Sequence, residues 1–159
     1  MLEFIDIQIP GWTGLRLIAS RSGIRGVEFG HSRPLAAQAD PGNPLLIEAE
    51  RQLRAYFAGA LRRFQIPLDL QGTPFQMQVW RELERIPFGE TRSYSQLARA
   101  VGSPRAVRAV GAANGANPAA IVVPCHRVIG SSGRLVGYGG GLPLKRRLLE
   151  LEGISCKMD

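Results

Sequence analysis

Residues 93–113, SYSQLARAVGSPRAVRAVGAA, decide the fold of the second half of this 159-residue chain. Ser93 and Gln96, three positions apart, form a capping box that begins a first short helix. Gly102 ends this helix, and a second helix follows over residues 105–113. Two short helices around a tight glycine turn predict a helix-turn-helix, a motif whose second helix enters a groove of DNA.

The second of these helices has the features of one that approaches a nucleic acid closely. Its small side chains allow the backbone to come near a groove, and Arg105 and Arg108 project from it. The small residues are Ala106, Ala109, Ala112 and Ala113. Helix pairs of this kind also occur in enzymes as plain packing, so the motif alone leaves DNA binding open.

The distribution of charge favours DNA. Residues 1–71 carry eight basic and seven acidic side chains, whereas residues 72–159 carry twelve and six. Residues 91–149 hold nine Arg or Lys and not one Asp or Glu. A merely basic protein would not segregate its charge in this way, so the segment is interpreted as a surface that meets phosphate.

The first half of the chain predicts a small sheet with one helix. Residues 4–9 alternate at period two, and residues 14–19 and 24–29 are further short strands. A helix runs from Asn43-Pro44 to Gly59 with one apolar face. This half offers no nucleophile and no acid–base pair, and we interpret it as a scaffold.

A break at residues 69–72 separates two domains of an α+β protein. We predict a scaffold domain over 1–71 and a winged helix-turn-helix-like domain, which binds DNA and carries the catalytic residues, over 72–159. Its other expected elements are a helix from Thr73-Pro74 to Pro87-Phe88-Gly89, strands over 121–123 and 134–138, a turn over 114–118, and a final helix from Pro143 to Gly153.

The six residues 123–128, VPCHRV, carry the candidate chemistry. A thiol attacks carbon only as its thiolate, and a free cysteine with a pKa of about 8.5 is mostly protonated at neutral pH. His126 is placed to take the proton of Cys125, directly or through one water. A lone cysteine is more often a small buried hydrophobe, so the assignment depends on the surrounding sequence.

Composition excludes several classes of protein. No apolar run approaches the roughly 20 residues of a membrane span, and the N-terminus lacks the basic region of a signal peptide. Two cysteines and two histidines, widely scattered, are too few for a disulfide framework or a structural zinc site. We therefore expect no metal, no cofactor and no membrane contact, in a cytoplasmic protein.

From about Gly72 to Gly153 the chain resembles the O6-alkylguanine-DNA alkyltransferases, and its first half resembles the ribonuclease-H-like domain of that family loosely. The order and spacing of several motifs together carry the resemblance. They are TRSYSQLA at 91–98, RAVG at 108–111, NP at 117–118, PCHRVIG at 124–130, GYGGG at 137–141 and LLELEG at 148–153.

The resemblance implies a catalytic set around one cysteine. Cys125 would accept the alkyl group irreversibly, His126 would act as a base through a bound water, and Glu152 would orient the imidazole. Asn117 would brace the turn that carries the cysteine. Tyr94 would donate a proton or hydrogen bond to N3 of the leaving guanine.

The resemblance also implies contacts with DNA. Arg108 would enter the base stack from the minor groove in place of the flipped nucleotide. The main chain of Val128 and of Gly139 would contact the base, and Tyr138 would border its pocket. Further DNA or substrate contacts would come from Ser93, Ser103, Arg105, Ala109 and Lys145. The expected partner is double-stranded DNA that contains O6-alkylguanine, with O4-alkylthymine as a further substrate, and the expected state is a monomer.

Two other functions are compatible with a helix-turn-helix. A lesion sensor would bind alkylguanine without chemistry, but the alkyltransferase-like proteins lack the cysteine that this chain has at position 125. A transcriptional regulator would need sequence specificity, which a single such motif rarely supplies.

Overall fold

The computed structural model describes residues 1–30 and 36–156 and forms two compact units. The first unit comprises Met1–Gln71 together with Pro118–Val122, and the second comprises Gly72–Asn117 with Val123–Asp159, of which residues 157–159 lie outside the described part. The segment 118–122 thus belongs by its contacts to the first unit, although the sequence predicts that it lies in the second domain.

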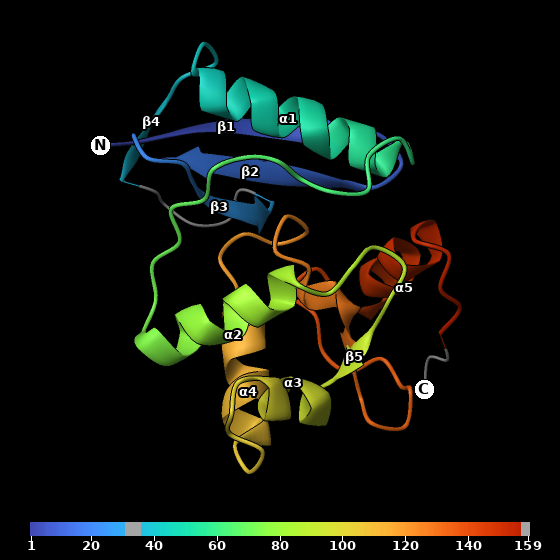
Figure 1. The fold of residues 1–159 in the computed structure, drawn as a ribbon. Helices are drawn as coiled ribbons and strands as arrows, with labels where there is room; N and C mark the ends of the chain where they lie inside the picture. Colours follow the sequence, from blue (N-terminus) through green and yellow to red (C-terminus); the bar gives the residue numbers. More distant parts are fainter. Residues whose placement is uncertain (31–35, 157–159) are drawn as a thin grey trace. The chain divides into compact units, whose positions relative to one another are not determined.

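The first unit is a four-stranded sheet with a helix. Its strands are β1 (Leu2–Ile9), β2 (Thr13–Ala19), β3 (Ile24–Phe29) and β4 (Ala37–Ala39), in the order β3-β2-β1-β4. β1, β2 and β3 are antiparallel neighbours, and β4 pairs in parallel with β1 (Figure 1).

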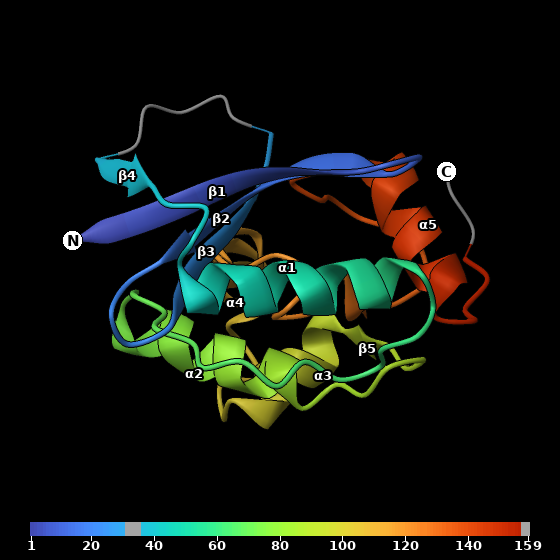
Figure 2. The ribbon, with the colours of Figure 1, turned by 90° about the horizontal axis from the view of Figure 1, so that it is seen from above.

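Helix α1 (Pro44–Phe57) covers one face of this sheet (Figure 2). The side chain of Asn43 accepts hydrogen bonds from two backbone amides of the first turn, as its position before a proline predicts. Alternate strand residues and one face of the helix make the core of the unit. The fully buried members include Leu15, Leu17, Ile24, Leu46, Leu53 and Tyr56.

The second unit is built mainly from helices, α2 (Pro74–Glu84), α3 (Tyr94–Ala100), α4 (Val107–Gly115) and α5 (Leu142–Leu151). Helices α3 and α4 form the predicted helix-turn-helix, and the capping box of Ser93 and Gln96 is present at the start of α3. Trp80 of α2 ties α4 in place, because its indole N–H donates to the carbonyl of Ala113 at 2.8 Å.

The bounds of α4 differ from those predicted. The helix begins at Val107, two residues later than predicted, and Ala106 before it has no polar side chain that could cap it. It continues through Asn114 and Gly115, which the sequence placed in a turn. One consequence is that the side chain of Asn114 projects from a helix and has a fixed direction.

A two-stranded parallel sheet links α3 to the candidate catalytic segment. β5 (Arg92–Ser93) pairs with β6 (Val128–Ile129), with Arg92 opposite Val128. The single 3₁₀ turn η1 (Cys125–Arg127) immediately precedes β6, and α3 immediately follows β5. The pairing therefore holds the first residue of α3 close to the segment that contains the cysteine.

The predicted strand over residues 121–123 is wrong. Ile121 has φ of 74° and the Val122 amide donates to the carbonyl of Ala120, which is the geometry of a γ-turn. Pro124 then has φ −81° and ψ 63°, and the Cys125 amide donates to the carbonyl of Val123, which is an inverse γ-turn. The run is apolar because it is buried and not because it is extended.

The predicted wing strand over residues 134–138 is also wrong. Only Arg134 makes a bridge, through a hydrogen bond of 2.8 Å from the Gly130 amide to its carbonyl. Gly133 and Gly137 have positive φ, a conformation that turns the chain out of an extended path. The segment is a loop, which we call the 130–141 loop. Within the described residues no helix is long and apolar enough to cross a membrane.

Candidate active site and DNA-binding surface

Cys125 is the first residue of η1 and is 7% exposed. Its position is fixed by the inverse γ-turn at Pro124 and by Asn117, whose amide Nδ2 donates to the carbonyl of Val123 at 2.8 Å. Asn117 lies two residues after the end of α4, so this bond connects the helix-turn-helix to the turn that presents the thiol. The bracing role expected for Asn117 is compatible with this geometry.

Burial raises the pKa of the Cys125 thiol above its ordinary value. A hydrogen bond from the Asn117 side chain and the charge of the Lys145 ammonium act in the opposite direction and offset part of this effect. The thiol is consequently protonated at neutral pH. Its chemistry needs a base at the moment of attack, since no resting thiolate is stabilised.

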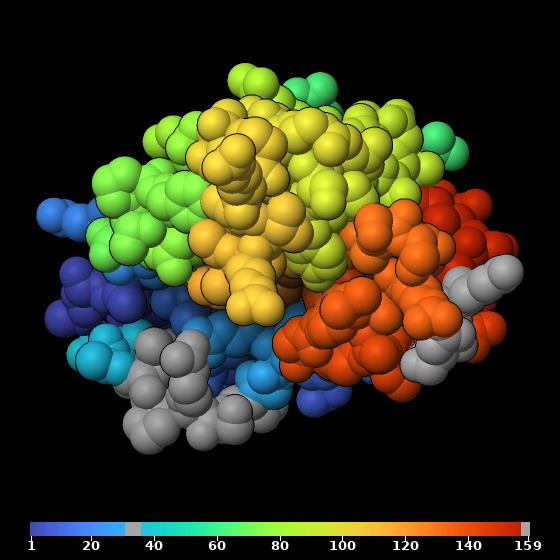
Figure 3. Space-filling view, turned by 90° about the horizontal axis from the view of Figure 1, so that it is seen from below, coloured from blue at the N-terminus to red at the C-terminus, as the bar shows by residue number. Residues whose placement is uncertain are grey.

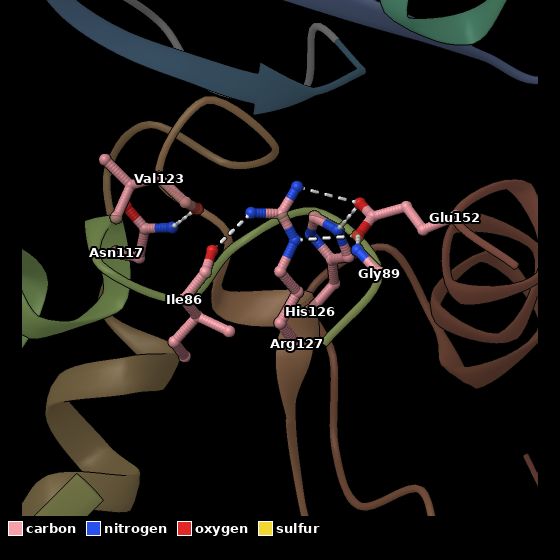
Figure 4. Close-up of polar contacts among 7 residues, drawn as sticks. All are labelled: Ile86, Gly89, Asn117, Val123, His126, Arg127 and Glu152. Carbon is pink, nitrogen blue, oxygen red and sulfur yellow. Dashed lines mark hydrogen bonds and ion pairs between the residues drawn. The ribbon is translucent and has the colours of Figure 1, made fainter. Parts of the chain in front are cut away.

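His126 is fully buried, and its Nε2 lies 2.7 Å from Oε2 of Glu152 (Figure 4). Burial lowers the pKa of the imidazole, and the hydrogen bond and charge of Glu152 oppose that shift without reversing it. The ring is therefore neutral at neutral pH. With the Nε2 hydrogen directed at the carboxylate, Nδ1 carries the lone pair that a base requires.

Glu152 caps the C-terminus of α5, and its carboxylate is 0% exposed. A negative charge at a helix C-terminus is unfavourable, so the carboxylate needs compensation. Oε1 accepts from the Gly89 amide at 3.2 Å and from Arg127 Nε at 2.7 Å, while Oε2 accepts from Arg127 Nη2 at 3.1 Å. Arg127 also donates to the carbonyl of Ile86 at 2.7 Å through Nη1 (Figure 4).

Arg127 is the functional residue that the sequence analysis missed. Among nine basic residues in a stretch without acids it was interpreted as part of a phosphate-facing surface, but it is only 6% exposed. Its position within an apolar segment, between His126 and Val128-Ile129, was the available signal. A buried arginine requires a carboxylate partner, and Glu152 is that partner.

Tyr94 begins α3, and its hydroxyl donates to the carbonyl of Val136 in the 130–141 loop at 3.2 Å. Burial raises the pKa of the phenol, and the neighbouring Cys125, when charged, raises it further. The hydroxyl therefore keeps its proton and lies within electrostatic range of the thiol. This is the placement that a proton donor to a bound base requires.

Lys145, which the sequence analysis placed among the DNA or substrate contacts, is buried inside the second unit. Its ammonium is fully buried and donates to the carbonyls of Val128 at 2.7 Å, Val136 at 3.0 Å and Gly137 at 3.3 Å. Burial lowers the pKa of this group to about 8. All three hydrogens are used inside the unit, so Lys145 fastens the 130–141 loop to β6 and cannot reach a phosphate.

The remaining predicted DNA contacts lie on or near the helix-turn-helix and in the 130–141 loop. Arg105, Arg108 and Ala109 are exposed, and α4 forms part of the surface shown in Figure 3. Ser103 is partly exposed in the turn before α4. The hydroxyl of Ser93 accepts a hydrogen bond from the backbone N–H of Gln96 at 3.1 Å, so it is occupied as a helix cap. In the 130–141 loop, Tyr138 is partly buried and Gly139 is exposed.

The described residues contain no group of three or more His, Cys, Asp or Glu side chains that could hold a metal ion. Both cysteines are free thiols. A buried thiol, a neutral imidazole and a carboxylate lie in one unit with a helix-turn-helix, an arrangement that fits a DNA-binding protein with a cysteine nucleophile.

Comparison with known proteins identifies the family. Residues 74–154 match the model of the DNA-binding domain of 6-O-methylguanine DNA methyltransferase, and residues 14–70 match the model of its ribonuclease-like domain. The chain belongs to the 6-O-methylguanine DNA methyltransferase family.

Individual relatives agree with this assignment. The methylated-DNA–protein-cysteine methyltransferase of Mycobacterium bovis is 61% identical over 120 residues, which cover 76% of this chain and 72% of the relative. The crystal structure of the O6-methylguanine methyltransferase of Mycobacterium tuberculosis matches with a TM-score of 0.87 and 48% identity, over 96% of this chain and 93% of that one. A Mycobacterium tuberculosis structure in complex with DNA matches with a TM-score of 0.83 and 49% identity, over 95% and 91% of the two chains.

Replacement of Arg127 by Met should lower the free energy of unfolding by about 3–5 kcal/mol, because it leaves the buried Glu152 carboxylate without its cation. Arg127→Lys keeps the charge but not the planar pair of hydrogen bonds, so its free energy of unfolding should lie between those of the wild-type protein and Arg127→Met. Urea denaturation measures this effect. The exposed Arg99→Met serves as the control, with an expected change within about 0.5 kcal/mol; equal losses for Arg99→Met and Arg127→Met would show that the pair contributes no more than a surface charge.

The reaction of Cys125 with an alkylating reagent should rise with pH at a higher midpoint than that of an ordinary thiol. Because burial raises its pKa, the thiolate fraction at any pH up to that value is smaller in the folded protein than in the unfolded one. Iodoacetamide labelling at a series of pH values, followed by peptide mass analysis, should give a midpoint for Cys125 at higher pH in buffer than in urea. A midpoint below about 8.5 in the folded protein would mean that a resting thiolate exists.

Proposed function

We propose that this protein repairs DNA by transferring the alkyl group of O6-alkylguanine to Sγ of its own Cys125, once and irreversibly. The observation that carries the proposal is a buried thiol on Cys125, the residue directly before His126 in the chain, together with the His126–Glu152 pair at 2.7 Å, in a unit with a helix-turn-helix. Support comes from relatives that are named methylated-DNA–protein-cysteine methyltransferases and from a solved relative in complex with DNA.

The transfer balances as a direct displacement. The S–C bond forms while the bond between the alkyl carbon and O6 breaks, and the thiol proton passes to Nδ1 of His126, directly or through one water. Glu152 stabilises the imidazolium that results. Tyr94 donates its hydrogen to N3 of the departing guanine, so the base leaves neutral. The products are restored guanine and a stable thioether, which ends the activity of that molecule.

The alkyl carbon is buried in duplex DNA, and the lesion must therefore be flipped out of the stack. We assign Arg108, exposed on α4, to the space that the flipped base leaves, with the helix in the minor groove. The minor groove is poor in sequence information, which suits damage that arises anywhere. We further propose that the protein acts as a monomer, in the cytoplasm, and that O4-alkylthymine is a second substrate.

The 130–141 loop and η1 would form the pocket for the flipped base. In this proposal the carbonyls of Cys125 and Val128 accept from the exocyclic amine, the Gly139 amide donates to O6, and Tyr138 borders the pocket. Lys145 would act indirectly, because it donates to the same Val128 carbonyl and to two carbonyls of the loop. Its role is to hold the two sides of the pocket together.

Cys125→Ser should abolish alkyl transfer and leave DNA binding nearly intact, since an alcohol ionises far less readily than a thiol. Incubation of the wild-type protein with O6-methylguanine duplex should add one methyl group to the peptide that contains Cys125. The yield should stop at one repaired lesion for each protein molecule. Sustained turnover beyond that ratio, or methyl addition at Cys156, would contradict the mechanism.

Arg108→Ala should slow repair of duplex DNA at least tenfold and change the reaction with free O6-benzylguanine less than twofold, because only the duplex requires flipping. Single-turnover rates on the two substrates measure this difference. Arg105→Ala is the matched control, since loss of a phosphate contact weakens binding to all DNA and lowers the salt slope by about one unit. Equal losses on both substrates for Arg108→Ala would place Arg108 in the pocket and exclude the flipping role.

A further inference from the structure

Helix α4 carries one polar side chain that is buried without an evident structural use. Asn114 is 6% exposed, and its Oδ1 has no hydrogen-bond partner within residues 1–30 and 36–156. A buried acceptor without a donor is destabilising. An apolar residue of the same size, such as Leu, would avoid that cost, so packing alone does not account for an amide at this position.

Tyr94 lies against the same face of α4. A Cβ atom at Gly111 would be 3.8 Å and 3.9 Å from Cδ1 and Cε1 of the Tyr94 ring, which places the ring in contact with that glycine. Gly111 and Asn114 are three residues apart and therefore share a face of the helix. The glycine lies against the ring, and the Asn114 side chain acts on the phenol: its hydrogen bond lowers the pKa of Tyr94 and offsets part of the rise caused by burial.

The direction of this hydrogen bond follows from the other contact of the hydroxyl. Tyr94 has one hydroxyl hydrogen, and it is donated to the carbonyl of Val136, a group that can only accept. Asn114 must then present its N–H to the phenol oxygen, and this leaves Oδ1 as the amide atom without a partner, as observed. An amide turned the other way would compete with Val136 for the same hydrogen.

We propose that Asn114 is a positioning residue for Tyr94 in alkyl transfer: its amide N–H donates to the Tyr94 hydroxyl oxygen and so directs the hydroxyl hydrogen away from α4, toward the base. This inference rests on the proposed function. When guanine enters, the Tyr94 hydroxyl turns its hydrogen bond from the carbonyl of Val136 to N3 of the base. As the C–O6 bond breaks and the proton moves to N3, the same N–H of Asn114 stabilises the phenolate that Tyr94 becomes.

The test compares Asn114→Leu, Tyr94→Phe and the double variant in single-turnover transfer from an O6-methylguanine duplex. A hydrogen bond to a developing anion is worth roughly ten- to hundredfold in rate, so Asn114→Leu should slow the wild-type protein by that factor. In the Tyr94→Phe background the same change should have less than a twofold effect, because no hydroxyl remains to be oriented. Equal factors in both backgrounds would overturn the proposal.

A second variant keeps the test valid if Asn114→Leu folds poorly. Asn114→Asp is nearly isosteric: its ionised carboxylate accepts the Tyr94 hydrogen and withdraws it from the base, whereas its protonated form can donate as the amide does. The ratio of its rate to the wild-type rate should rise as the pH is lowered from 8 to 5, and a constant ratio would overturn the proposal. If the wild-type protein itself transfers no methyl group, the proposed function fails instead, so the two failures are distinguishable.

Discussion

The site depends on the burial of one negative charge. The carboxylate of Glu152 is withdrawn from water at the C-terminus of α5, where the helix dipole opposes it, and it is tolerated because a guanidinium, an imidazole and a backbone amide surround it. The carboxylate and its partners come from three separate segments: the end of α5 supplies Glu152, the turn η1 supplies His126 and Arg127, and the loop after α2 supplies the Gly89 amide. Balancing this charge therefore also brings together the pieces of chain that present Cys125.

The charge balance distinguishes this site from a hydrolase triad of the same outline. In such a triad the carboxylate has no cation other than the histidine that it orients. Here Arg127 already neutralises Glu152, so the resting unit of Arg127, Glu152 and neutral His126 has no net charge. The burial of a neutral unit is less costly, and the thiol of Cys125, whose pKa burial raises, is protonated at neutral pH. A protein that reacts only once benefits from a nucleophile that is inactive in the absence of its substrate.

The sequence predicted those elements whose signals are local. Capping boxes, glycine stops and short strand patterns depend on neighbours in the chain. The structure has the predicted helix-turn-helix and all three predicted strands, β1 to β3, whereas the fourth strand of the sheet, β4, was not predicted. The path through residues 119–125 was not predictable in this way, because an apolar run does not distinguish a strand from two buried γ-turns. Arg127 and Lys145 were assigned to the surface by their charge, whereas their acceptors lie far away in sequence, at Glu152 and in the 130–141 loop. Such pairings depend on the tertiary fold.

The short loop over residues 118–122 belongs to the first unit by its contacts, although the chain on either side of it belongs to the second. The loop leaves the second unit after Asn117, pairs with β3 through Val27, and returns to the second unit at Val123. The Asn117 side chain donates a hydrogen bond to the carbonyl of Val123. This bond therefore joins the two ends of the loop directly before the inverse γ-turn that leads into Cys125. The turn that carries Cys125 thus follows a loop whose backbone is hydrogen-bonded to the sheet of the first unit.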